Sequence, residues 1–284
     1  MRLSDNHFCE LNREEGSRPL FILPGIGGKT DRFRMFGNIF RHVCGVIGLE
    51  MMGTQRNETP FDSIREIAEQ NIRWIRMVQP RGPYRFVGHS FGSFVMYEMT
   101  QQLEAAGEGI DFMMVLDQPM SELPGFPADL NKAALIGELL NIARDYYEGF
   151  RVLEAPYPNW GPALMARLGA LPFSGLVRYL SAFMKEKYPH KASTIEYVSR
   201  LINIRLYNSS IAYQPCGEIE SEVIVLNALR AREANDDETL GWSACARNLK
   251  SLVIDGNHHD IVWGNNVVKV TEYIKKRIGS NHLP

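Results

Sequence analysis

The sequence has 284 residues, 45% of them hydrophobic, and a formal net charge of −2 at pH 7. This is enough for one large core, or for a core with a sizeable insertion. Lysine and arginine are spread along the chain instead of forming a basic tract, which argues against nucleic-acid binding. No apolar stretch approaches the roughly 20 residues that cross a bilayer, and the polar residues 1–18 contain no segment typical of a secretory signal. We therefore expect a cytoplasmic protein that binds neither nucleic acid nor membrane.

The four cysteines lie far apart and form neither a CxxC pair nor a metal-ligand spacing. Such an arrangement indicates free thiols in a reducing compartment. The residues concerned are Cys9, Cys44, Cys216 and Cys245.

Short apolar runs alternate with amphipathic segments up to residue 117 and again after residue 221. The runs predict buried strands at 19–25, 45–50, 84–90, 111–117, 222–228 and 249–255. The amphipathic segments predict helices at 32–43, 63–80, 94–109 and 265–278, the second with Ser63 as N-cap and Pro80 as its stop. Apolar strands separated by helices predict an α/β fold, with a mostly parallel central sheet covered by helices on both faces.

Residues 118–220 interrupt this alternation with a helical pattern rich in aromatic side chains. Because the sheet needs the strands on both flanks to be complete, we expect one domain over 1–284, with 118–220 as a helical lid insertion between sheet strands. An independent helical domain is the alternative interpretation.

The stretch Gly88-His89-Ser90-Phe91-Gly92 has the G-x-S-x-G pattern and stands between a predicted strand and a predicted helix. In that setting the serine sits on a sharp turn at the carboxyl edge of the sheet, where open α/β folds bind their ligands. We therefore expect Ser90 to be a nucleophile, and His89 to point away from the reaction. The alternative is a serine that only caps the following helix.

A serine nucleophile needs a neighbouring base and an acid that orients the base. In this fold the chain order is Ser, then Asp or Glu, then His. Asp117 ends the strand after the serine turn, and His258 follows the last strand in DGNHHDIVWG, so both are expected at the same edge. His259 is the rival base. The rival acids follow the fifth strand: Glu233, Asp236 and Asp237.

The glycine-rich segment LPGIGG, residues 23–28, follows the first strand. Main-chain N–H groups of Gly25 or Ile26, together with that of Phe91, are the expected donors of an oxyanion hole. A simple tight turn is the alternative. The segment lacks the G-x-G-x-x-G spacing of a dinucleotide site.

The segment from SIREIAEQNIRWIRMVQPRGPYRFVGHSFGS through YEMTQQLEAAGE to VLDQPM resembles the thioesterase domains of polyketide synthases and nonribosomal peptide synthetases. LGW at 240–242 and DGNHHDIV resemble the Gly-Trp segment and histidine loop of those domains, whereas Ser93 replaces their usual second glycine. The resemblance implies an α/β-hydrolase fold, with Ser90 as acyl nucleophile, Asp117 as orienting acid and His258 as general base. It also implies a helical lid over an acyl channel and a phosphopantetheinyl carrier protein as acyl donor.

We therefore expect a thioesterase that takes a polyketide or peptide acyl chain from a carrier protein and releases it by hydrolysis or intramolecular cyclisation. The substrate would arrive on a phosphopantetheine arm, and no metal or other cofactor is expected. A free-standing type II editing thioesterase and a non-catalytic module that docks carrier protein are the alternatives.

Overall fold

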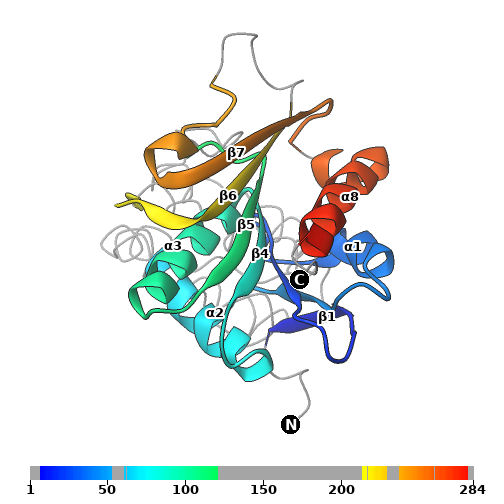
Figure 1. The fold of residues 1–284 in the computed structure, drawn as a ribbon, viewed down its shortest axis with the longest axis horizontal. Helices are drawn as coiled ribbons and strands as arrows, with labels where there is room; N and C mark the ends of the chain where they lie inside the picture. Colours follow the sequence, from blue (N-terminus) through cyan, green and yellow to red (C-terminus); the bar gives the residue numbers. More distant parts are fainter. Residues whose placement is uncertain are drawn as a thin grey trace, which may run out of the picture. The chain divides into compact units, whose positions relative to one another are not determined.

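The computed structural model describes residues 7–52, 61, 63–120, 213–215, 217–228, 237–258 and 260–280, all within one compact unit. Within these residues a seven-stranded sheet has the order β1-β3-β2-β4-β5-β6-β7 (Figure 1). Strand β1 pairs antiparallel with β3, and every other neighbouring pair is parallel. The predicted, mostly parallel sheet is confirmed. The strands are β1 (Phe8–Asn12), β2 (Leu20–Leu23), β3 (Val46–Leu49), β4 (Tyr84–His89), β5 (Ile110–Leu116), β6 (Ile219–Ala228) and β7 (Ala246–Ile254).

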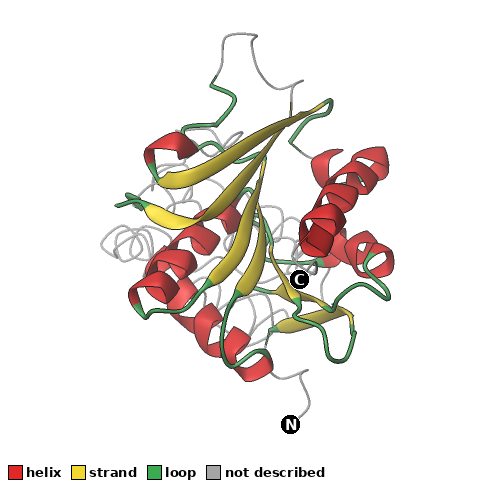
Figure 2. Ribbon diagram, in the orientation of Figure 1, coloured by secondary structure: helices red, strands yellow, loops and turns green. Residues whose placement is uncertain are grey.

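Helices cover both faces of the sheet (Figure 2). Helices α1 (Arg34–Ile39) and α8 (Gly264–Ser280) pack together on one face, where Phe36 and Ile274 join one buried cluster with Val87 and Met114 of the sheet. Helices α2 (Ile64–Val78) and α3 (Phe91–Ala105) pack together on the other face. Most of α3 is buried because it lies between the sheet and α2.

The ends of α2 follow the local sequence signals. The hydroxyl of Ser63 accepts a hydrogen bond from the N–H of Glu66 at 3.2 Å, which is the expected N-cap contact. The helix ends at Val78, ahead of Pro80. The helix predicted over 32–43 is shorter in the structure, where a 3-10 turn, η2 (Asp31–Phe33), leads into α1.

Strand β1 is absent from the sequence-based assignment. Its residues Phe-Cys-Glu-Leu-Asn are only partly buried, and the strand lies at the edge of the sheet. An edge strand that buries little apolar surface has a weak hydrophobic pattern. The polar composition of residues 1–18 therefore does not predict this strand.

The predicted lid lies largely outside the described residues and stays a prediction; β6 begins at Ile219, inside the predicted insertion 118–220. Among the described stretches no helix is long and apolar enough to span a bilayer.

Cys9, Cys44 and Cys245 are free thiols, as expected, while Cys216 lies outside the described residues. Burial raises the pKa of Cys44 to about 11, so this thiol stays protonated near neutral pH.

Candidate active site

The register of the parallel strands brings Ser90 and Asp117 to one edge of the sheet. His89 at the end of β4 pairs with Leu116 at the end of β5, so the residue after each strand leaves the sheet at the same level. The N–H of Asp117 donates to the carbonyl of Leu226 in β6 at 2.8 Å. Both side chains therefore start from neighbouring strands at the carboxyl edge, as the sequence predicts.

Ser90 occupies a sharp turn between β4 and α3. Its φ is +52° and its ψ −129°, a left-handed conformation that is strained for a residue with a side chain. Helix α3 starts at the next residue and approaches the end of β2 closely. A Cβ atom on Gly92 would lie 2.3 Å from the carbonyl oxygen of Leu23 and 2.5 Å from that of Pro24. Only glycine at this position allows the helix so close to the strand.

Ser93 follows the turn at the position where the thioesterase domains that the sequence resembles usually have glycine. Its buried hydroxyl donates to the carbonyl oxygen of Gly88 at 3.0 Å and so joins the first turn of α3 to the end of β4. Ser90 itself stands at the N-cap position, but its hydroxyl makes no capping hydrogen bond. Ser90 is thus the N-cap of α3 by its main-chain position and not through a side-chain hydrogen bond.

Asp117 and His258 are in direct contact. His258 Nδ1 lies 3.0 Å from Asp117 Oδ2 and 2.9 Å from the main-chain oxygen of Asp117. The other carboxylate oxygen, Oδ1, accepts the N–H of Ala228 at 2.8 Å, which fixes the orientation of the carboxylate. Asp117 is almost fully buried and has a φ of +51°, so its position is set by the end of β5 and by β6.

These contacts define the tautomer of neutral His258. A carbonyl oxygen and a carboxylate oxygen can only accept a hydrogen bond, so the proton must be on Nδ1. The lone pair that can accept a proton is then on Nε2. This is the protonation pattern that a general base for a serine hydroxyl requires.

Asp237, the rival acid within the described residues, takes part in a turn. Asp237 accepts hydrogen bonds from the hydroxyl and N–H of Thr239 and from the N–H of Gly241, and these bonds lower its pKa. It shapes the turn that leads into η4 (Trp242–Ala244). The other rival residues lie outside the described residues: Glu233, Asp236 and His259.

The Gly-Trp segment supports the chain beyond Asp117. Trp242 is fully buried, and its indole N–H donates to the carbonyl of Gln118 at 2.7 Å. The N–H of Met120 donates to the carbonyl of Leu240 at 2.8 Å. Only the family resemblance drew attention to this segment in the sequence, because a buried tryptophan alone indicates core.

The glycine-rich loop after β2 lies against the serine turn. A Cβ atom on Gly25 would be 3.3 Å from the Cβ of Ser90. The loop is held to the end of β3, because the hydroxyl of Thr30 donates to the carboxylate of Glu50 at 3.2 Å and the N–H of Met51 donates to Gly28 O at 3.0 Å. The structure thus brings the loop beside Ser90 and Phe91, and leaves Gly25 and Ile26 as alternative donors.

The expectation that His89 points away from the reaction is wrong. The rings of His89 and His258 stack with their centroids 4.9 Å apart and their planes at 29°. His89 Nε2 lies 3.0 Å from the carbonyl oxygen of His258. Its side chain leaves the last position of β4 on the face that the returning histidine loop covers, a relationship that sequence spacing alone does not reveal.

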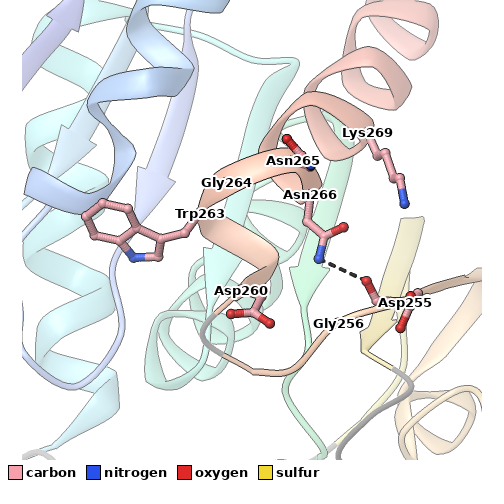
Figure 3. Close-up of a pocket in the computed structure, with 8 residues that line it drawn as sticks. All are labelled: Asp255, Gly256, Asp260, Trp263, Gly264, Asn265, Asn266 and Lys269. Atoms are coloured by element: carbon pink, nitrogen blue, oxygen red, sulfur yellow. Dashed lines mark hydrogen bonds between the residues drawn. The ribbon is translucent and has the colours of Figure 1, made fainter.

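A polar pocket of about 330 Å³ lies beside the histidine loop, where α8 begins (Figure 3). The described residues that line it are Asp255, Gly256, Asp260, Trp263, Gly264, Asn265, Asn266 and Lys269. None of the three predicted catalytic residues is among them. Asn266 Nδ2 donates to the carbonyl of Asp255 at 3.0 Å across this pocket. In the described part of the chain, no group of three or more His, Cys, Asp or Glu residues has the arrangement of a metal site.

Residues 18–143 match the family model described as "Thioesterase domain". Over 112 residues the chain is 34% identical to indigoidine synthase of Streptomyces lavendulae, a match that covers 39% of this chain and 9% of that protein. The chain thus spans only a small part of the curated relative.

The solved structures that share the fold include a type II thioesterase and a thioesterase domain. The type II thioesterase YbtT from the yersiniabactin pathway aligns with a TM-score of 0.64 at 15% identity, over 96% of this chain and 98% of that one. The NocB thioesterase domain, in covalent complex with a fluorophosphonate nocardicin G analogue, aligns with a TM-score of 0.61 at 17% identity, over 96% and 99%. These likenesses confirm the predicted α/β-hydrolase fold.

Proposed function

We propose that the chain takes an acyl group from a carrier-protein thioester onto Ser90 and then releases it, as suggested by the match of residues 18–143 to the thioesterase domain model. The observation that carries the proposal is the contact of His258 Nδ1 with Asp117, at the sheet edge where Ser90 leaves β4 on a strained turn. That arrangement suits a serine, a base and an acid acting together.

In the first step the Ser90 oxygen bonds to the thioester carbonyl carbon, and its proton passes to His258 Nε2. The carbonyl oxygen becomes an oxyanion, which the N–H of Phe91 and that of Gly25 or Ile26 stabilise. One such donor typically contributes roughly 3–4 kcal/mol to the transition state. When the C–O double bond re-forms, the C–S bond breaks and the proton of His258 moves to the sulfur. The products are acyl-Ser90 and a free carrier thiol.

In the second step a nucleophile resolves the acyl-Ser90 ester. His258 takes a proton from water, or from a hydroxyl or amine of the acyl chain, and returns a proton to the Ser90 oxygen as the ester bond breaks. Water gives a free acid, whereas an internal nucleophile gives a lactone or lactam. Asp117 holds His258 in the required tautomer throughout and stabilises its protonated form.

The proposed donor is an acyl or peptidyl carrier protein, whose phosphopantetheine arm brings a polyketide or peptide chain to Ser90. We further propose that residues 118–220 form a lid whose apolar side chains line the acyl channel. A lid that excludes water would favour cyclisation over hydrolysis. The proposed chemistry uses no metal or other cofactor, and the proposed location is the cytoplasm.

A second candidate is a free-standing type II thioesterase that removes stalled acyl groups. The type II thioesterase YbtT and the NocB thioesterase domain both share the fold of this chain, so the fold is compatible with either candidate. The two candidates share the chemistry of Ser90 and differ in the acyl groups that they release.

Intact-protein mass spectrometry after incubation with a panel of acyl thioesters tests the proposal. The wild-type protein is expected to gain the mass of the acyl group, and Ser90→Ala to gain none. A fluorophosphonate probe should likewise label only the wild type. Faster release of short, aberrant acyl groups than of long chains would favour the editing thioesterase. If neither thioesters nor the fluorophosphonate form an adduct with the wild type, the proposal is wrong and the chain is a non-catalytic docking module.

A further inference from the structure

His89 touches three parts of the proposed machinery although the proposed chemistry does not use it. Its Nε2 lies 3.0 Å from the carbonyl oxygen of His258, and its ring stacks on the ring of His258. On the other side, a Cβ atom on Gly25 would be 3.3 Å from His89 Nδ1. His89 is buried, with 5% of its surface exposed, so solvent does not replace these contacts.

The hydrogen bond fixes the tautomer of His89. Because the carbonyl oxygen of His258 can only accept, Nε2 of His89 must carry the proton. The two stacked rings are therefore opposite tautomers: His89 is protonated on Nε2, whereas neutral His258 is protonated on Nδ1. His89 holds the main chain of His258, while Asp117 holds its ring.

The surroundings also keep His89 uncharged. Burial lowers its pKa to about 3, with further lowering by His258 and by Arg32, although Asp117 and the bond to His258 oppose the shift. When His258 takes the proton of Ser90, the ring stacked on it therefore stays neutral. A second positive charge at this distance would repel the protonated base.

We propose that His89 is a positioning residue, which holds the main chain and ring of His258 in the geometry that accepts the proton of Ser90. This inference rests on the proposed function of Ser90 and His258. A misplacement of about 1 Å at a reacting group can cost about 100-fold in rate. Loss of the Nε2 donor is therefore expected to slow attack by Ser90, without changing the residues that touch the substrate.

Four substitutions distinguish the effect of the hydrogen bond from His89 Nε2 from the effect of side-chain packing. His89→Phe keeps an aromatic ring but has no donor. His89→Gln can place an amide N–H near the position of Nε2, whereas the shorter side chain of His89→Asn cannot reach it. The control is Phe33→Leu, because Phe33 packs edge-on against His89, with ring centroids 6.2 Å apart, and is also buried. It removes comparable packing and leaves the bond to His258 in place.

The measurement is the rate constant and the final extent with which a fluorophosphonate labels Ser90, recorded with the melting temperature of each variant. We expect His89→Phe and His89→Asn to react completely but about 10- to 100-fold more slowly. His89→Gln should recover at least part of the rate. Phe33→Leu should lower the melting temperature and keep the rate constant within about twofold. If His89→Phe does not fold, the comparison of Gln with Asn decides the question.

Equal rate constants for Gln and Asn, or a wild-type rate constant in His89→Phe, would overturn the inference. A lower final extent of labelling with an unchanged rate constant would also overturn it, because a residue that only stabilises the fold changes the fraction of active protein. Failure of the proposed function gives a different result, because the wild-type protein itself would then remain unlabelled at Ser90.

Discussion

His258 Nδ1 lies 3.0 Å from the carboxylate of Asp117 and 2.9 Å from the main-chain oxygen of the same residue. One buried residue thus supplies two acceptors to the imidazole, and only one of them is in its side chain. The other carboxylate oxygen, Oδ1, accepts a hydrogen bond from the N–H of Ala228 at 2.8 Å. Because the two carboxylate oxygens have different partners, an amide at this position would have one preferred orientation.

Asp117→Asn is expected to keep the fold and to lose about 10²- to 10⁴-fold in turnover. The amide oxygen should face the N–H of Ala228, which needs an acceptor, so the amide NH₂ faces His258 and favours the wrong tautomer. The main-chain oxygen of Asp117 still accepts from Nδ1 and limits the loss. Turnover of an acyl thioester measures the effect, and unfolding in urea is the control. Near-normal turnover would place the orienting acid elsewhere, for example at Glu233 or Asp236.

His258→Ala is expected to lower turnover by several orders of magnitude, as removal of a triad member does in known serine hydrolases. His259→Ala should cost far less, because the contact with Asp117 is made by His258. The two variants form a matched pair from one loop, assayed with the same acyl thioester. The opposite ranking would assign the base to His259 and contradict our interpretation of the loop.

Most of what positions the candidate site could be predicted from local sequence. The apolar runs locate β2, β4 and β5, and the glycines around Ser90 mark the sharp turn, because these features depend on neighbours along the chain. The positions of Ser90 and Asp117 after strand ends predict that both lie at the carboxyl edge of the sheet, where His258 contacts Asp117. Parallel strands bring their carboxyl ends together whatever the loops between them contain.

What could not be predicted depends on contacts between distant segments. Strand β1 is an edge strand stabilised by pairing with β3, and its own sequence carries little apolar pattern. The side-chain direction of His89 depends on where the loop of His258 returns over the sheet, 169 residues further along the chain. The role of Asp237 as a turn former, likewise, is visible only from its bonds to Thr239 and Gly241.

Ser90→Gly is expected to be more stable than Ser90→Ala by about 1 kcal/mol. Both variants remove the hydroxyl, but only glycine adopts the observed φ of +52° without strain. Urea unfolding of the two variants measures the difference, and neither should form an acyl adduct. Equal stabilities, or a more stable alanine variant, would mean that the turn relaxes once the serine is removed.

Trp242→Phe is expected to destabilise the fold by about 1–3 kcal/mol, because it removes a buried donor to the carbonyl of Gln118. The aromatic contact with Tyr97, at a centroid distance of 5.8 Å, is largely kept by the phenylalanine ring. Trp74→Phe is the control, since Trp74 is a buried tryptophan of α2 that stacks on His7. A larger fall in turnover for Trp242→Phe than for Trp74→Phe would show that this hydrogen bond supports Asp117. Equal effects on turnover would limit Trp242 to a role in stability.

The buried, neutral His89 makes the stability of the protein depend on pH. Its pKa is about 3 in the folded protein against an ordinary value of 6.5, so between these values the unfolded chain binds the extra proton. Protonation then favours unfolding: the contribution of the neutral ring is complete above about pH 6.5 and is lost as pH falls toward 3, by about 1.4 kcal/mol per pH unit. From pH 7 to pH 5 the wild type should therefore lose about 2 kcal/mol more unfolding free energy than His89→Phe. Urea titrations of both proteins at the two pH values give this difference, in which groups common to both proteins largely cancel. Parallel losses in the two proteins would mean that His89 is protonated in the folded state as readily as in the unfolded chain, contrary to its burial against His258.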